Sequence, residues 1–205
     1  IQAAIRQAMQ ARDKLGGIIE IAAFGLPVGL GSFIQWDKRL DARLGAALLS
    51  IPAIKGFEIG EAFENSRLPG TQVHDAIHLQ GEAVTRETNR AGGLEGGVTN
   101  GQPLLLRVAM KPIATTLTPQ ATIDLASGEQ TSTVYERSDF CPVPRAVPVC
   151  EAMTAFVLAD ALLEKLGGDS LDEMKPRFAA LRKAALRDLK MTGKPAVFWP
   201  AREDA

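Results

Sequence analysis

The segment NRAGGLEGGVTNGQP, residues 89–103, constrains the fold of this chain more than any other stretch. Six of its fifteen residues are glycine or proline, and only Leu94 and Glu95 separate its two glycine pairs. A chain gathers so much backbone freedom where the backbone has a task, either a tight turn or a close approach to a flat or anionic ligand. The segment lacks the dinucleotide fingerprint, which needs a helix after the glycines, and the Gly-Lys-Ser/Thr of a P-loop. A surface turn and a ligand-facing backbone both stay open at this point.

The chain is predicted to form one domain over residues 1–205, because no repeat or low-complexity linker divides it. A content of 46% hydrophobic and 23% charged residues is typical of a soluble globular protein. A net charge of −1 gives no electrostatic reason to expect nucleic acid or an anionic membrane as a partner. Two isolated cysteines, Cys141 and Cys150, argue against a disulfide framework or zinc site and favour a reduced, cytoplasmic setting. No apolar run reaches the length of a membrane span.

Hydrophobic periodicity predicts an α+β fold in which helices and antiparallel strands are interleaved. Helices are predicted over 1–14, 37–52 and 146–168, with a last one starting at the capping box of 170–173. Strands are predicted over 18–25, 54–60 and 103–112, a hairpin over 120–139 turning at Ser127-Gly128, and loops with brief strands over 61–103. The helix over 146–168 is expected to bury one face, formed by Val149, Met153, Phe156, Val157 and Leu163. The chain opens without Met and inside an apparent helix, so we expect it to be a fragment of a longer protein.

Charged and hydroxylated residues near the ends of two predicted strands are the candidates for chemistry. Lys111 ends the strand over 103–112, and Thr115 and Thr116 follow it closely, a combination that suits a phosphate or a polar ring edge. Arg137 and Asp139 are two residues apart and lie on the same side of an extended backbone. The arginine offers a planar fork for an oxyanion, and the aspartate offers a base. A solvated lysine and an exposed ion pair are the alternatives.

Two histidines, His74 and His78, are four residues apart with Asp75 beside the first. A helical H-x-x-x-H pair can hold a metal ion. The segment has no helical periodicity, however, and no third ligand is near in sequence, so we predict loop histidines and no metal site. Asp75 is predicted to hold a loop locally.

Three blocks of sequence, in this order, resemble the chorismate synthase family. The first joins LPVGLGS to WDKRLDARLGAALLSIPAIKGFEIGEAF, the second is TNRAGGLEGGVTNGQPLLLRVAMKP, and the third is RSDFCPVPRAVPVCEAM. The block SIPAIKGFEIG and the third block are the most specific to that family. The resemblance extends from Gly16 to Leu166 and covers the C-terminal part of the enzyme. The N-terminal half of the family, with two catalytic histidines, has no counterpart in this sequence.

The resemblance implies a β-α-β sandwich, with long helices between antiparallel sheets, assembled as a homotetramer in the cytoplasm. It implies a lyase of the shikimate pathway of aromatic amino acid biosynthesis, a flavoprotein that uses reduced FMN. Its substrate would be 5-enolpyruvylshikimate 3-phosphate, converted to chorismate and phosphate by 1,4-anti elimination. Two sources of reduced flavin stay open, a separate reductase and an intrinsic activity with NADPH.

The resemblance also implies site residues, position by position. The flavin contacts would be Pro52, Ala53, Gly96, Lys111, Pro112, Ile113, Ala114, Thr115 and Arg137. Arg137 would also bind substrate, and Asp139 would exchange a proton with the flavin as the substrate proton is lost. On this reading the glycine-rich segment lets a backbone press against the flavin.

The chain departs from the family pattern in two motifs. The usual RHDP is RSDF here, with Ser138 and Phe140 in the places of His and Pro, and KPTSS is replaced by KPIAT. The second change removes two hydroxyls, at Ile113 and Ala114. Because the family's histidines are absent, we expect the fragment alone to be inactive. A non-catalytic flavin- or phosphate-binding module and an oligomerisation domain are the alternative functions.

Overall fold

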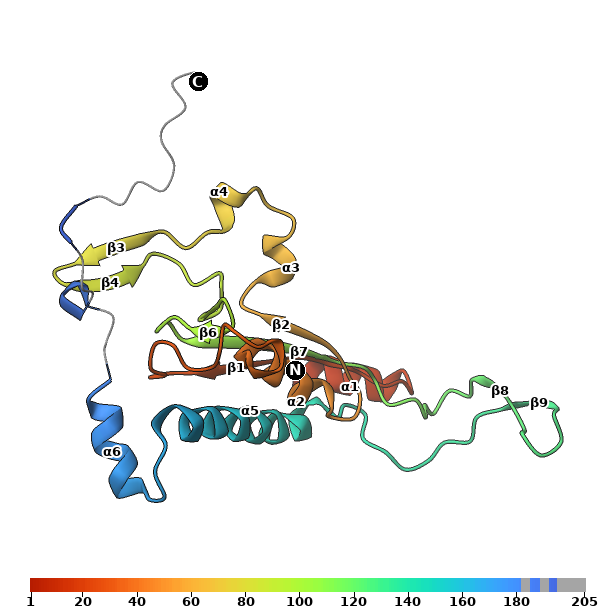
Figure 1. Cartoon of the computed structure of the whole chain (residues 1–205). Coiled ribbons are helices and arrows are strands. Elements are labelled where there is room, and N and C mark those ends of the chain that lie inside the picture. The colour runs from red at the N-terminus through yellow and green to blue at the C-terminus, as the bar shows by residue number, and fades with distance from the viewer. Residues whose placement is uncertain (182–184, 189–191, 195–205) are drawn as a thin grey trace.

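A three-stranded antiparallel sheet forms the centre of the molecule in a computed structural model that describes residues 1–181, 185–188 and 192–194 (Figure 1). Its strands are β1 (Gly17–Ala23), β7 (Leu104–Met110) and β2 (Ile54–Ile59), in the order β1-β7-β2. Burial alternates along the central strand β7, which directs Leu104, Leu106 and Val108 to one face, where all three are buried. The predicted strands 18–25, 54–60 and 103–112 are therefore confirmed.

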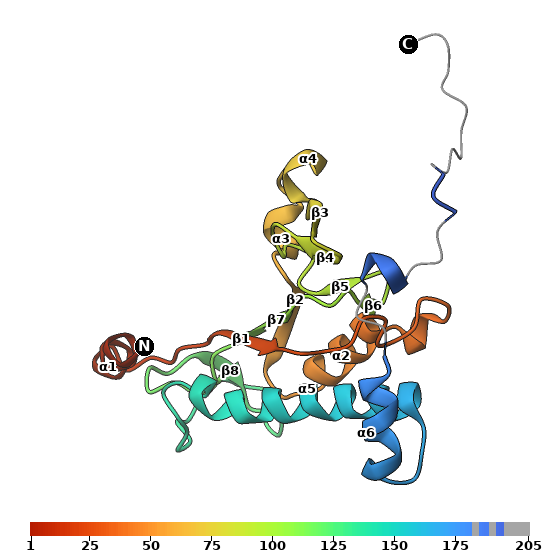
Figure 2. The same cartoon turned by 90° about the vertical axis from the view of Figure 1, so that its left-hand side faces the viewer.

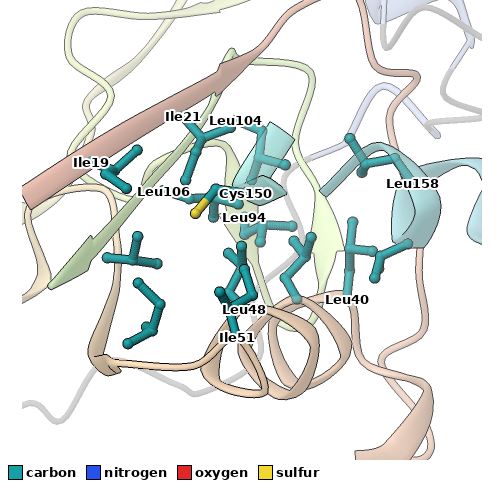
Figure 3. Close-up of a cluster of buried hydrophobic side chains, with 14 of the residues drawn as sticks. Ile19, Ile21, Leu40, Leu48, Ile51, Leu94, Leu104, Leu106, Cys150 and Leu158 are labelled. Carbon is teal, nitrogen blue, oxygen red and sulfur yellow. The ribbon is translucent and has the colours of Figure 1, made fainter. Parts of the chain in front are cut away.

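Two helices, α2 (Leu40–Leu49) and α5 (Val143–Leu166), cover the buried face of this sheet (Figure 2). Figure 3 shows the core between the layers, where Ile19 and Leu106 of the sheet meet Leu48 of α2 and Cys150 of α5. Leu40, Leu44 and Leu48 recur at helical spacing in α2, and all three are fully buried. The described residues thus form a central three-stranded sheet layered on helices, with three further two-stranded sheets, an α+β fold as predicted.

On the opposite face of the sheet, one row of side chains across the three strands is charged. Glu20 of β1, Arg107 of β7 and Glu58 of β2 occupy one row of the register. Arg107 Nη1 lies 3.3 Å from Glu58 Oε2, and Arg107 Nε lies 3.9 Å from Glu20 Oε2. Opposite charges directly across strands stabilise a sheet modestly and favour this register.

The predicted buried face of the helix over 146–168 is wrong for three of its five residues, whereas Val157 is buried and Met153 packs against the core. The residues that face the core are Ala146, Cys150, Thr154, Val157, Leu158 and Ala161. Val149, Phe156 and Leu163 are instead exposed, at 46%, 72% and 51%. Small side chains on the buried face let the helix approach the sheet closely, which leaves the larger residues outside. We call Val149, Phe156 and Leu163, which repeat every seven residues, the outer stripe of α5.

The remaining elements are short. Their bounds are α1 (Gln2–Gln10), η1 (Trp36–Lys38), α3 (Ala62–Asn65), α4 (Gly70–Val73), β3 (Ile77–Gln80), β4 (Ala83–Arg86), β5 (Leu94–Glu95), β6 (Val98–Thr99), β8 (Ala121–Ile123), β9 (Gln130–Ser132), α6 (Leu171–Ala179) and η2 (Leu186–Asp188). Two predicted helices are shorter than expected. The first ends at Gln10, because Arg12 adopts a left-handed φ of 58°, and the one over 37–52 is interrupted by the extended Arg39. Ser170 is confirmed as the N-cap of α6, since its Oγ accepts the Glu173 amide.

Strands β8 and β9 form a hairpin that extends away from the body of the molecule, with its turn at Gly128 as predicted (Figure 1). Most of residues 116–137 are exposed, including Leu125 at 89% and Val134 at 81%. We call residues 116–136 the arm. The arm leaves the body directly after Thr115 and returns at Arg137.

Contrary to the sequence expectation, α5 is long and apolar enough to cross a membrane, judged by length and composition among the described residues. Its inner face is buried against β1 and α2. It therefore serves as the core helix of this fold.

Candidate functional site

Most glycines of the segment 89–103 serve internal packing. A Cβ on Gly92 would lie 2.3 Å from the Gly60 nitrogen, one on Gly93 2.5 Å from the Pro103 oxygen, and one on Gly97 2.6 Å from the Ser32 oxygen. These three glycines are buried, and they bring backbone against backbone.

Gly96 differs from the other three. It is exposed, and a Cβ built on it meets no described atom within 4 Å. Gly96 and Gly97 both have positive φ and form the two-residue turn between β5 and β6. Of the four glycines in the two pairs, only Gly96 leaves room for a ligand to approach its backbone.

Asp75 anchors the start of this segment. Its carboxylate accepts the amides of Arg90 at 2.8 Å and Ala91 at 3.0 Å, together with the Thr88 hydroxyl. Burial alone would raise the pKa of the Asp75 carboxyl, but these three hydrogen bonds and the charge of Arg86 together lower it below its usual value. The predicted loop-holding role of Asp75 is confirmed by these contacts.

We expect Asp75→Ala to reduce the free energy of unfolding by about 1.5–3 kcal/mol at pH 7, the usual range for hydrogen bonds to a charged group. Because the folded pKa is lowered, this stabilisation is present above the unfolded pKa and is lost as the pH falls through the folded pKa. Urea unfolding at pH 7 and at pH 3 measures both effects. Asp169→Ala is the control, because Asp169 is exposed and makes no hydrogen bond or ion pair within the described ranges, and it should change the free energy by about 0.5 kcal/mol or less. An equal effect of both variants would contradict the anchoring role.

The predicted cofactor residues 52–53 and 111–115 lie side by side at one end of the sheet. The Lys111 amide donates to the Ala53 carbonyl at 2.9 Å, which joins the exit of β7 to the loop between α2 and β2. Ala53 adopts a φ of 70°, which is rare for a residue with a Cβ. Backbone strain of this kind gathers at binding sites, where the surrounding structure holds it in place.

The segment 137–140 is held by Lys14 and joins the same cluster through Ser138. The Lys14 ammonium donates to the Ser138 carbonyl at 3.0 Å, the Ser138 hydroxyl at 2.8 Å and the Asp139 carbonyl at 2.9 Å. Ser138 Oγ also lies 3.3 Å from Thr115 Oγ1. Residues 53, 111–115 and 137–139 are thus linked to one another by hydrogen bonds.

Lys14 also contacts both residues at which RSDF departs from the family pattern. Its ammonium bonds Ser138 and lies 5.0 Å from the ring centre of Phe140, with the Tyr135 ring on another side at 5.1 Å. Cations are attracted to the faces of aromatic rings at this separation. The two departures therefore form the pocket that holds the Lys14 ammonium.

Charges at the cluster are available to an anion. Lys111 and Arg137 are exposed, and neither forms an ion pair with any residue in the described part of the chain. The Asp139 carboxylate lies 3.2 Å from Arg145 Nε in the first turn of α5, and its side chain is 38% exposed. The cluster therefore combines two free cations with one carboxylate that has a cationic neighbour.

Sequence reasoning missed Lys14 and Arg145. Lys14 lies 124 residues from its acceptor Ser138, so no local pattern signals the contact. Arg145 stands one helical turn after Pro142, the N-cap of α5, but the predicted start of that helix at 146 excluded it.

The structure does not bring Gly96 to this cluster. The glycine-rich segment packs at the start of β7, where the Leu105 amide donates to the Gly92 carbonyl at 3.0 Å. Lys111 follows the other end of β7. At about 3.3 Å per residue, the strand separates the two ends by about 20 Å.

The histidine pair is not formed on a helix. His74 is the C-cap of α4, and His78 lies in β3, where its Nε2 is 3.5 Å from Glu87 Oε2. Cys141 and Cys150 are free thiols, and burial raises the pKa of the Cys150 thiol. A groove of about 620 Å³ between α1, β1 and the start of α5 is lined by none of the predicted site residues.

Comparisons with known proteins agree with the sequence resemblance. The sequence model of a family described as chorismate synthase matches residues 1–163. The chain is 53% identical over 177 residues to the chorismate synthase of Syntrophotalea carbinolica, covering 86% of this chain and 46% of that protein. It is 54% identical over 186 residues to that of Chlorobaculum tepidum, covering 90% of this chain and 47% of that protein.

A solved structure described as a crystal structure of chorismate synthase has a similar fold. It superposes with a TM-score of 0.72 at 46% identity, and the match covers 87% of this chain and 46% of the solved chain. The chain thus spans about half the length of the curated relatives it matches.

Proposed function

This chain belongs to the chorismate synthase family, and from that premise we propose that it forms the half of such an enzyme that holds the flavin and a catalytic carboxylate. The complete enzyme converts 5-enolpyruvylshikimate 3-phosphate to chorismate and phosphate by 1,4-anti elimination, a step of the shikimate pathway. The single observation that carries this proposal is the cluster in which residues 53, 111–115 and 137–139 are joined by hydrogen bonds.

The cluster fits an anionic, flat cofactor such as FMN. Lys111 and Arg137 are exposed cations without an ion-pair partner in the described ranges, which suits a phosphate or the polar edge of a ring. Pro112, Ile113 and Ala114 between them offer backbone and small apolar surface rather than hydroxyls. Reduced FMN, when bound, supplies the transient electron density that lets phosphate leave the substrate.

Asp139 is the residue that we propose handles the proton. Its carboxylate is accessible, so it can accept a proton. Before that transfer, Arg145 at 3.2 Å balances the negative charge of the carboxylate. Arg137, two residues earlier, would orient the anionic substrate beside it. The remaining catalytic groups come from the half of the family protein that this chain does not contain.

Assembly as a cytoplasmic homotetramer is also part of the proposal. One observation supports assembly. Gly96, the open glycine, lies at the other end of β7 from Lys111, so Gly96 would reach the same flavin from a second copy. The outer stripe of α5 supports the proposed β-α-β sandwich instead, because it is exposed and apolar, as a helix layer is before a second sheet covers it.

We expect Lys111→Ala and Arg137→Ala in the complete enzyme each to weaken FMN binding about ten- to a hundred-fold. Each removes a charge-assisted hydrogen bond, worth about 1.5–3 kcal/mol. The dissociation constant is measured by the absorbance change of the flavin. Lys55→Ala is the matched control, because Lys55 is an exposed lysine close to Ala53 that no motif assigns to the site. Unchanged affinity in both variants would refute the placement of the flavin.

A non-catalytic flavin- or phosphate-binding module and an oligomerisation domain are distinguished from the enzyme by the same titration. Flavin binding by the chain without turnover, even when it is joined to the missing half, would identify a binding module. Oligomers that bind no flavin would identify the oligomerisation domain.

A further inference from the structure

Lys14 is the only charged side chain that is buried among the described residues, with 4% of its surface exposed. Taking an ammonium out of water is unfavourable unless its hydrogen-bonding capacity is met inside the protein. The residue therefore needs a specific set of partners, and these partners define its role.

The partners of Lys14 use all of its donors. An ammonium has three N–H groups. The three acceptors are the Ser138 carbonyl, the Ser138 hydroxyl and the Asp139 carbonyl, at 2.8–3.0 Å. The rings of Tyr135 and Phe140 cover the ammonium on other sides. No N–H group is left for a ligand, so Lys14 acts through the segment 137–140.

The contacts of Lys14 fix the backbone from which the side chains of Arg137 and Asp139 extend. Lys14 holds the carbonyls of residues 138 and 139, which are the peptide groups before and after the Asp139 Cα. The next residue, Leu15, donates its amide to the Phe140 carbonyl at 2.8 Å and extends the same attachment. Ser138 also contacts Thr115, so the attachment reaches the flavin segment at the base of the arm.

Resting on the function proposed above, we propose that Lys14 is a positioning residue that orders the segment 137–140 for catalysis. Its ammonium touches neither flavin nor substrate. It fixes the backbone on both sides of Asp139, so that the carboxylate and the Arg137 guanidinium face the site together. Without Lys14 both charges remain, but their directions are no longer set.

Lys14→Met tests this role in the complete enzyme, because methionine keeps the length of the stem and removes all three donors. We expect turnover to fall about ten- to a hundred-fold, in line with misplacement of a catalytic group. KM should rise by a smaller factor than that by which turnover falls, because Lys14 holds both peptide groups that flank Asp139 and neither of those that flank the substrate-binding Arg137. Hydrogen exchange should accelerate in residues 135–140 and stay unchanged in β7.

Lys165→Met is the matched control. Lys165 Nζ also donates to a backbone carbonyl, that of Gly29 at 3.0 Å, but at the far end of α5. This variant should leave turnover, KM and exchange in residues 135–140 at their wild-type values. If Lys14→Met no longer unfolds cooperatively, Ser138→Ala decides the matter, because it removes one acceptor and keeps both carbonyls. It should accelerate exchange in residues 135–140 and lower turnover about threefold or more.

The outcomes separate the two proposals. Unchanged exchange in residues 135–140 of Lys14→Met would overturn the attachment itself. Accelerated exchange with wild-type turnover would overturn the positioning role while leaving the enzyme intact. A wild-type protein that binds no flavin and gives no chorismate would refute the proposed function, and the positioning role would fall with it.

Discussion

Asp139→Asn is expected to lower turnover of the complete enzyme by a factor of about 10²–10⁴, the usual effect of losing a general base. Asparagine keeps the size of the side chain and can still accept a hydrogen bond from Arg145, which lies 3.2 Å from the carboxylate. The backbone at 139 stays attached to Lys14 through its carbonyl. FMN and substrate affinities should therefore stay within a few-fold of the wild-type values.

Anaerobic turnover with reduced FMN, measured beside substrate binding, tests this prediction. The control is Asp172→Asn on α6, where another exposed carboxylate lies 3.8 Å from a cation, Lys175. The control should turn over at the wild-type rate. Wild-type turnover in Asp139→Asn would remove this residue from the mechanism. Lost substrate binding with normal turnover at saturation would instead make it a binding group.

Gly92→Ala is expected to reduce the free energy of unfolding by about 2–5 kcal/mol. A Cβ at this position would lie 2.3 Å from the Gly60 nitrogen and 2.6 Å from its Cα, and backbone atoms cannot move aside easily. Overpacking of this kind costs about 1–3 kcal/mol, and the left-handed φ of 62° adds about 1–2 kcal/mol for a residue with a Cβ.

Gly96→Ala is the matched control for this variant, because Gly96 has the same φ of 62° and open space around it. It should reduce the free energy of unfolding by the backbone contribution alone, about 1–2 kcal/mol. Urea unfolding of both variants measures the difference, which isolates the close approach of Gly60 and Gly92. Equal losses would show that the close approach contributes nothing to stability.

The strands of the sheet and the main helices could be predicted from the sequence, because each is determined by residues close together along the chain. The apolar run that begins with Leu104 is short and lies between Pro103 and Pro112, which favours a buried strand over a helix. In α5, by contrast, apolar residues occur on two faces, and periodicity cannot choose between them. The bulkier Phe156 looks like a core residue, yet the sheet selects the face of Ala146 and Cys150.

The candidate site was only partly predictable for a related reason. Motifs supplied Lys111, Arg137 and Asp139, whose residue types carry the chemistry. Lys14 and Arg145, which contact residues 138 and 139, are unremarkable in their local sequence and acquire these contacts only when the chain folds. The glycine pairs show the same limit, since the close approach of Gly92 to Gly60 depends on a segment some thirty positions earlier.

Both ends of the arm are attached to the candidate site, so the arm can link the site to the assembly of subunits. The first strand of the arm follows the predicted flavin segment that ends at Thr115, and the second returns to the body at Arg137. The tip of the arm lies away from the body (Figure 1). If another subunit holds the tip in an assembled enzyme, the motion of both ends of the arm is restricted, and the flavin contacts proposed at those ends would restrict the tip in turn. Thermodynamic reciprocity then makes the two events help each other equally, so subunits should associate more tightly when flavin is bound, by the same factor by which association tightens flavin.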